Sequence, residues 1–74
     1  MNRVRTMRLV CSDFWADVRL TELNGRWLAS ADTPDGPSLG TAWFPFDAVQ
    51  AALEPVDGFA EDLLATVPTD LTWR

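Results

Sequence analysis

The stretch Leu23-Asn24-Gly25-Arg26-Trp27 decides the fold, because Asn-Gly between alternating apolar residues is the strongest short-range signal for a tight β-hairpin. A two-residue type I′ turn needs positive φ at both central positions, and asparagine and glycine adopt it more readily than other residues. With Asn24 and Gly25 at the centre, the sequence predicts an antiparallel hairpin over about residues 15–32.

The register that follows from this turn separates the two faces of the hairpin. It pairs Leu20 with Ala29 and Val18 with Ala31, so one face is almost wholly apolar. That face carries Val18, Leu20, Trp27, Ala29 and Ala31. The opposite face is mostly polar, and its apolar exceptions, Leu23 and Leu28, are candidates for a small contact patch.

The same register places Asp17 opposite Asp32. Like charges directly across a strand pair repel each other, so we expect the pairing to end or splay at this point. Two close carboxylates could otherwise form an acid dyad or a cation site, but the solvent face of a hairpin lacks the burial that a dyad needs.

Flanking segments predict the rest of a sheet. Residues 3–11 place Met7, Leu9 and Cys11 on one side, which indicates an N-terminal edge strand beside the hairpin. Residues 33–40 hold two prolines and two glycines and are predicted to be a turn-rich crossover loop. Residues 41–44 are short and apolar, either a third strand or an extended lead into the next helix.

Two short helices are predicted after this sheet. Apolar residues recur at helical spacing from Phe46 to Val56, and Pro45 suits a first helical position, so we expect a helix over about 45–54. A second helix over about 58–67 would begin at a cap on Asp57. Its apolar stripe comprises Phe59, Ala60, Leu63, Leu64 and Val67.

The predicted fold class is therefore α+β: a small antiparallel sheet backed by two short helices, in a single domain over residues 1–74. A domain this small buries only about 60% of the surface that its unfolded chain exposes. Some aromatic surface should remain for a homodimer interface, and the candidates outside the regular core pattern are Trp43, Phe44, Leu71 and Trp73. Alternatively, Trp43 and Trp73 close the ends of a monomer core.

Charge is unevenly distributed along the chain. Residues 32–74 hold eight acids against Arg74 alone, and there is no lysine, so we expect no nucleic-acid partner and no membrane partner. Charged residues interrupt every apolar run near the N-terminus, so no signal peptide is expected. A lone cysteine is typical of a cytoplasmic protein.

The chain is also poor in reactive side chains. It has no histidine, and Cys11 is its only cysteine, so no intrachain disulfide, zinc site or base-activated thiol is expected. The Gly-rich loop lacks the Lys-Ser/Thr of a phosphate-binding loop. We predict no catalytic, metal-binding or cofactor-binding residues, and no small-molecule ligand can be identified.

Part of the chain resembles a known family. Gly25–Asp32, a Pro-containing loop, Gly40-Thr41, Asp47-Ala48 and Ala52-Leu53 occur in the order that is found in the HicB-like antitoxin domain, over about residues 15–56. The resemblance implies a sheet backed by a helix and a partner-neutralising role. The chain departs from the family where Thr41 directly follows Gly40, and where residues 57–74 are acidic instead of forming a DNA-binding segment.

Three functions are compatible with these patterns. The first is a small non-enzymatic protein-interaction module, homodimeric and cytoplasmic, in a bacterium. The second is an antitoxin- or inhibitor-like protein whose acidic half covers a basic surface of a partner. The third is a carboxylate-dependent enzyme, the least favoured because no nucleophile–base set exists.

Overall fold

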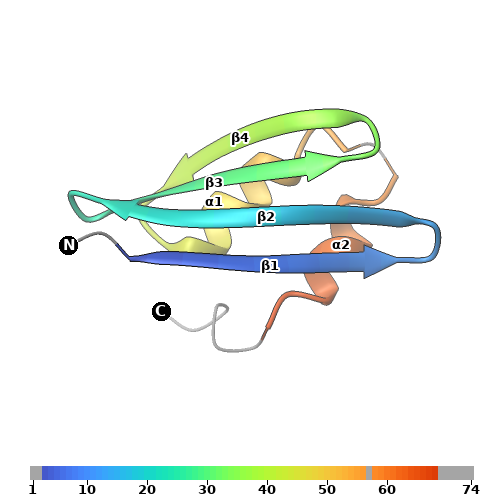
Figure 1. Cartoon of the computed structure of the whole chain (residues 1–74), viewed down its shortest axis with the longest axis horizontal. Helices are drawn as coiled ribbons and strands as arrows, with labels where there is room; N and C mark the ends of the chain where they lie inside the picture. Colours follow the sequence, from blue (N-terminus) through green and yellow to red (C-terminus); the bar gives the residue numbers. More distant parts are fainter. Residues whose placement is uncertain (1–2, 57, 69–74) are drawn as a thin grey trace.

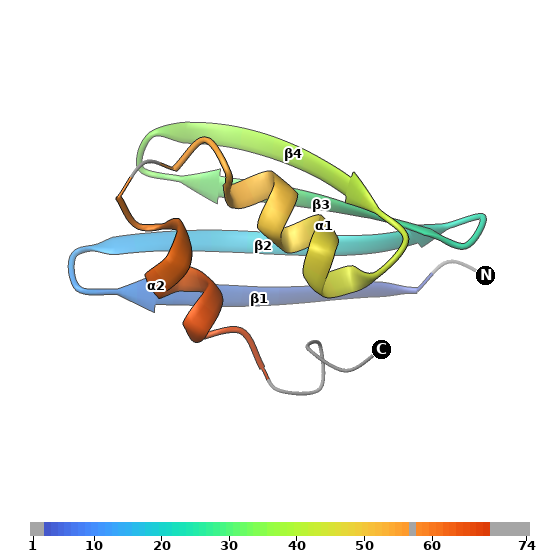
Figure 2. The same ribbon diagram turned by 180° about the vertical axis from the view of Figure 1, so that it is seen from behind.

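Four antiparallel strands joined by short turns form one sheet, with the strands in sequence order. The computed structural model describes residues 3–56 and 58–68. Its elements are β1 (Val4–Cys11), β2 (Phe14–Leu23), β3 (Arg26–Thr33), β4 (Gly36–Ala42), α1 (Pro45–Leu53) and α2 (Ala60–Ala65). Figure 1 shows the sheet in front of both helices, and Figure 2 shows the helices from their own side. The predicted α+β class is confirmed.

The central hairpin forms as its turn predicts. Asn24 and Gly25 both have positive φ, 53° and 82°, as a type I′ turn requires. β2 and β3 pair from Leu23↔Arg26 through Leu20↔Ala29, in the register derived from the sequence. The prediction of the hairpin and of its register is confirmed.

β1 is the predicted N-terminal edge strand. It pairs antiparallel with β2, with Met7 opposite Val18 and Leu9 opposite Ala16. Leu9 is buried, while Met7 and Cys11 are partly buried and pack against the core. The apolar side of β1 therefore extends the inner face of the hairpin.

The crossover loop predicted for residues 33–40 is wrong over most of its length. Only a tight turn joins Thr33 to Gly36, and the chain then returns as β4 along β3. The Thr33 side chain holds the turn: its hydroxyl donates to the Gly36 carbonyl at 2.9 Å and accepts from the Asp35 amide at 3.1 Å. Pro37 is tolerated because β4 is an edge strand of the described sheet, where a missing N–H is least costly.

The sequence left open whether residues 41–44 form a strand or an extended lead into the helix, and the structure shows a part of each. Thr41 and Ala42 end β4, whereas Trp43 and Phe44 form a bend that leads into α1. Phe44 is the N-cap of this helix and Pro45 opens it, as the sequence predicts.

Gly40 is where the helix approaches the sheet. A Cβ atom built on Gly40 would lie 2.3 Å from the Ala52 amide nitrogen and 2.7 Å from the Ala48 carbonyl oxygen, both on the backbone of α1. No side chain fits in that space. Gly40 therefore allows close packing between helix and strand and is not part of a turn.

The core lies between the inner face of the sheet and the two helices. Small residues of β2 and β3 face α1, and larger apolar side chains fill the space around them. The buried apolar residues are Leu9, Phe14, Ala16, Val18, Leu20, Ala29, Ala31, Ala48, Val49, Ala52, Leu53, Val56, Leu63 and Val67. Trp27, predicted on this face, is partly buried and packs against the cluster.

The second helix is shorter than predicted and begins later. α2 spans six residues, Ala60–Ala65, instead of 58–67, and its N-cap residue is Phe59. The expected cap, Asp57, lies outside the described residues. Phe59 stacks on Phe14 of β2 with ring centroids 4.6 Å apart, and Gly58 has a φ of 84°, so tertiary packing and backbone geometry place the start of the helix.

The prediction that the hairpin pairing ends or splays at Asp17 is half right. Asp17↔Asp32 is the last pair between β2 and β3, and β3 continues to Thr33 by pairing with β4. The two aspartates are nevertheless paired with each other and are not splayed apart. The reason lies on the next strand, where Arg8 pairs opposite Asp17 and forms an ion pair with its carboxylate. A cation beside one of the two aspartates reduces the repulsion between them.

Candidate interaction surface

The outer face of the sheet is not covered by any element of the described chain. In Figure 1 this face is turned toward the viewer, and α1 and α2 lie behind it. Strand alternation places on it every second residue of each strand, including Leu28 of β3 and Leu39 of β4. We call this the open face.

Apolar side chains gather on the open face from the Asn24-Gly25 turn to the middle of β4, where Leu39 pairs with Ser30. Trp43 is 64% exposed, Leu39 is 67% exposed and Leu23 is 43% exposed. A shallow hollow of about 250 Å³ lies among Leu23, Arg26, Trp27, Leu28 and Thr41. We define the hairpin-end patch as Leu23, Arg26, Leu28, Leu39, Thr41 and Trp43.

Arg26 of β3 contacts both Thr41 of β4 and Trp43 in the bend that follows β4. The Arg26 guanidinium lies 5.0 Å from the centre of the Trp43 ring, and its Nη2 donates to Thr41 Oγ1 at 3.5 Å. A cation over an indole face is attracted by the ring quadrupole. The exposed Trp43 is thus held against Arg26, with part of its ring still open to solvent.

Three of the sequence-predicted contact residues join this patch. Leu23, Leu28 and Trp43 lie together, while Phe44 is exposed at the N-cap of α1. Leu71 and Trp73 lie outside the described residues. Sequence reasoning missed Leu39, and the signal that could have found it is the two-residue alternation of Leu39, Thr41 and Trp43.

The far end of the open face carries a second arginine on a tryptophan. The Arg8 guanidinium lies 5.0 Å from the centre of the Trp15 ring. It also binds Asp17 through two bonds, from Nε to Oδ1 at 2.6 Å and from Nη2 to Oδ2 at 2.9 Å. Hydrogen bonding by Arg8 lowers the pKa of the Asp17 carboxyl, and the bond to Asp17 raises the pKa of Arg8.

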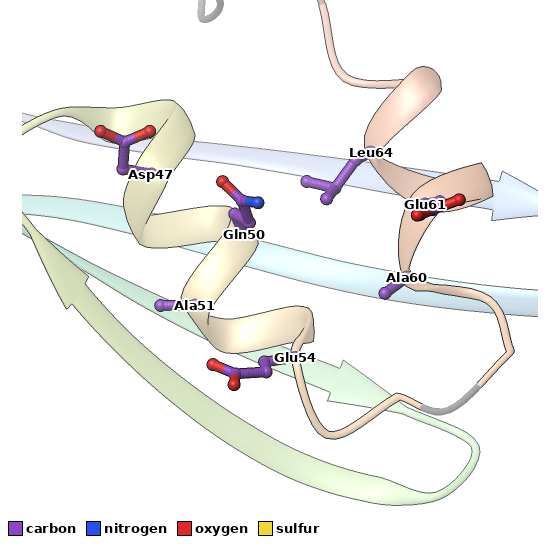
Figure 3. A pocket seen from close by; sticks show the side chains of 7 residues that line it. All are labelled: Asp47, Gln50, Ala51, Glu54, Ala60, Glu61 and Leu64. Carbon is purple, nitrogen blue, oxygen red and sulfur yellow. The ribbon is translucent and has the colours of Figure 1, made fainter.

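A second surface feature lies on the helix side. Figure 3 shows a groove between α1 and α2, with Leu64 projecting from α2 into the space between the helices. The groove measures about 550 Å³ and its lining combines three carboxylates with small and apolar side chains. Its lining residues are Asp47, Gln50, Ala51, Glu54, Ala60, Glu61 and Leu64.

The described part of the chain has neither a metal-binding cluster nor a membrane-spanning helix. Among residues 3–56 and 58–68, no group of three or more His, Cys, Asp or Glu side chains lies close enough together to hold a metal ion. Within the same ranges, neither helix has the length and apolar character needed to cross a membrane.

Comparison with known proteins adds no assignment. No protein-family model, no curated protein and no solved structure matches the chain at a significant level. The similarity to the HicB-like antitoxin domain stays a prediction from the sequence.

Proposed function

We propose that this protein is a small non-enzymatic protein-interaction module that binds through the open face of its sheet. The observation that carries the proposal is the hairpin-end patch, where Leu39 and Trp43 are both about two-thirds exposed on a face that no described element covers. Exposed apolar side chains gathered in one place are typical of protein contact sites. Tryptophan and arginine, which stack here as Arg26 and Trp43, are the residues most enriched in binding hot spots.

A cytoplasmic location in a bacterium is part of this proposal. It is supported by the single cysteine of the chain, which leaves no intrachain disulfide of the kind common in exported proteins.

Site-specific photo-crosslinking tests the proposal. A photoreactive amino acid replaces Leu39 on the open face or, as the matched control, Ala65, which is exposed on α2 and lies outside the groove lining. Both variants are expressed in the cells from which the protein comes. We expect position 39 to crosslink to one defined protein, which is either this chain or another, and position 65 not to do so. Equal, diffuse crosslinking from both positions would contradict the proposal.

The groove between the helices favours a second candidate function, that of an antitoxin- or inhibitor-like protein. Asp47, Glu54 and Glu61 line the groove, and the sequence has no arginine or lysine between Arg26 and Arg74. A carboxylate rim around apolar side chains is complementary to arginine side chains, which combine an apolar stem with a cation.

A short polyarginine peptide probes this second candidate. Fluorescence titration near physiological salt should detect binding, and the double variant Glu54→Gln with Glu61→Gln should weaken it. Asp32→Asn removes one charge from the open face and is the control. Weakening of equal size in the control would mean that only the overall charge of the protein matters.

A further inference from the structure

We infer that the partner of the hairpin-end patch is a second copy of this chain, packed face to face on the open face of the sheet. The inference rests on the proposed function, because it names the occupant of the same surface. Three features of the described residues support it: the charges of the two sides of the molecule, the breadth of the open face and the character of its edge strand.

The charge distribution favours approach through the open face. The charged residues contributed by α1, α2 and the described part of the segment between them are all acidic: Asp47, Glu54, Glu61 and Asp62. Two copies of a chain with a net charge of −5 repel each other most strongly where these acids meet. The strands, by contrast, place both signs on the open face: Arg8, Arg19 and Arg26 with Asp17 and Asp32.

The mixed signs of the open face are also self-complementary. Arg8 and Asp17 satisfy each other, whereas Arg19 and Asp32 have no ion-pair partner within residues 3–56 and 58–68. In a two-fold contact, residue i of one copy meets residue j of the other, and j meets i. Arg19 of each copy can therefore pair with Asp32 of the other. A polyanionic partner would repel Asp32, and a strongly basic partner would repel Arg19, so neither would satisfy both charges.

The open face lies on the broadest side of the molecule. The molecule extends 35 × 23 Å across the view of Figure 1, and the rectangle that bounds it there measures about 800 Å². An interface of standard size buries about 800 Å² of accessible surface on each partner, so it would use most of this face. The hairpin-end patch supplies an apolar, aromatic centre for such an interface, and the threonines and charges of the same face supply a polar rim.

Face-to-face packing fits the hairpin-end patch better than strand addition at the β4 edge. β4 is an edge strand of the described sheet, and Pro37 lies near its start. A proline lacks the backbone N–H that a strand addition uses, and edge prolines discourage such addition. Leu39 and Trp43 extend from the face of the sheet and not along its edge, so they are buried only when another surface lies over that face.

Sedimentation velocity of the full chain over a range of micromolar concentrations tests the inference. We expect a concentration-dependent monomer–dimer equilibrium. Leu39→Glu should raise the dissociation constant at least about tenfold, since it places a charge in the apolar centre of both copies. Ala65→Glu adds the same charge at an exposed position of α2, outside the groove lining, and should leave the constant within about twofold, a change of less than half a kcal/mol.

A charge exchange tests the proposed pairing without touching the apolar side chains. Arg19→Asp alone and Asp32→Arg alone should each weaken the dimer, and the double variant should restore it. Both positions are exposed, so circular dichroism is expected to show the same fold for all three variants. Failure of the double variant to restore the dimer would overturn the proposed geometry.

The results also separate this inference from the proposed function. A single species of monomer mass at every concentration overturns the dimer, whether the patch then serves another protein or residues 69–74 of the same chain. If position 39 nevertheless crosslinks to a different protein, the interaction module stands and only the identity of the partner is wrong. A dimer that Leu39→Glu leaves unchanged uses another surface and overturns the inference, while the crosslinking from position 39 decides the proposed function separately.

Discussion

Leu20 and Leu39 lie on strands of the same sheet, yet Leu20 is 0% exposed and Leu39 is 67% exposed. The two leucines lie on opposite faces of the sheet, and these faces carry different kinds of side chain. The inner face carries alanines and Gly40 under α1, so the helix packs almost on the strand backbone. The open face instead carries two Arg–Trp stacks, Arg8 on Trp15 and Arg26 on Trp43. Trp15 and Trp43 thus lie on the open face, whereas Trp27 and Phe14 of the hairpin pack in or against the core.

Under the proposed function, we expect the inner face to determine the stability of the fold and the open face to determine association. Substitutions on the inner face should reduce the free energy of unfolding, whereas those on the open face should mainly alter association. Substitutions on both faces test this difference between stability and association, from the largest expected effect on stability to the smallest.

Gly40→Val should cause the largest loss. The added side chain would meet backbone atoms of α1, which cannot move aside as a flexible side chain can. We expect a cost above about 3 kcal/mol, since overpacking of this kind displaces the backbone. A domain of this size has only about 4–11 kcal/mol of stability in total. Thermal unfolding followed by circular dichroism should show a weak transition or none.

Gly36→Ala is the control for Gly40→Val. Gly36 has a φ of 114°, but no atom lies within 4 Å of the position of its added Cβ. Its cost should be that of the backbone conformation alone, about 1–2 kcal/mol. If both variants lose equal stability, the close packing of α1 is not the reason why position 40 needs a glycine.

Leu20→Ala and Leu39→Ala compare the same truncation on the two faces. Leu20 is fully buried, so its loss should cost about 3 kcal/mol, within the range for leucines that leave a cavity. Leu39→Ala should change the free energy of unfolding by less than about 0.5 kcal/mol at a concentration where the chain is monomeric. Urea denaturation measures both values. Similar losses in the two variants would remove the distinction between the faces.

Gly25→Val should have a smaller effect, limited to the hairpin turn. A β-branched residue is strained at the φ of 82° that Gly25 adopts, at a cost of about 1–3 kcal/mol. The space around its Cβ is open, so no packing term adds to this cost. Asn24→Gly, at the other central position, keeps the turn accessible and should be nearly neutral. A Gly25→Val variant as stable as the parent would show that the turn does not need positive φ.

The smallest effect is expected on the pH dependence of stability, through the Asp17 carboxyl on the open face. The pKa of Asp17 in the folded chain is lowered from its ordinary value of 3.8 by the hydrogen bond from Arg8. A lowered carboxyl pKa contributes stability that is complete above pH 3.8 and is lost as the pH falls through the lower folded value. Asp17→Asn should flatten the pH dependence of the melting temperature below pH 4. The control Asp32→Asn leaves the Arg8–Asp17 ion pair intact and should therefore keep the pH dependence that this pair causes.

The patterns in the sequence were sufficient for features whose causes are local. Asn24-Gly25 specifies its turn through φ preferences alone, and that turn sets the register of β2 and β3 and the face of each residue. Leu23 and Leu28 could therefore be placed on the open face beforehand. Pro45 likewise marked the start of α1.

The candidate site was only partly predictable because it depends on β4. Pro37 and Gly40 are turn residues by composition, and only pairing with β3 makes them part of a strand. Once β4 is in place, Leu39 points outward and Trp43 lies beside Arg26, a contact between residues distant in sequence.

The sequence by itself determined the hairpin, its register, the N-terminal strand and the existence of two helices, because turn chemistry and periodicity act between near neighbours. The tertiary structure alone decided that residues 36–42 form a strand, that Gly40 lies under α1 and that α2 begins after Phe59. The physical reason is that weak local preferences yield to packing. A proline and two glycines disfavour a strand, but pairing with β3 and burial under α1 outweigh that preference.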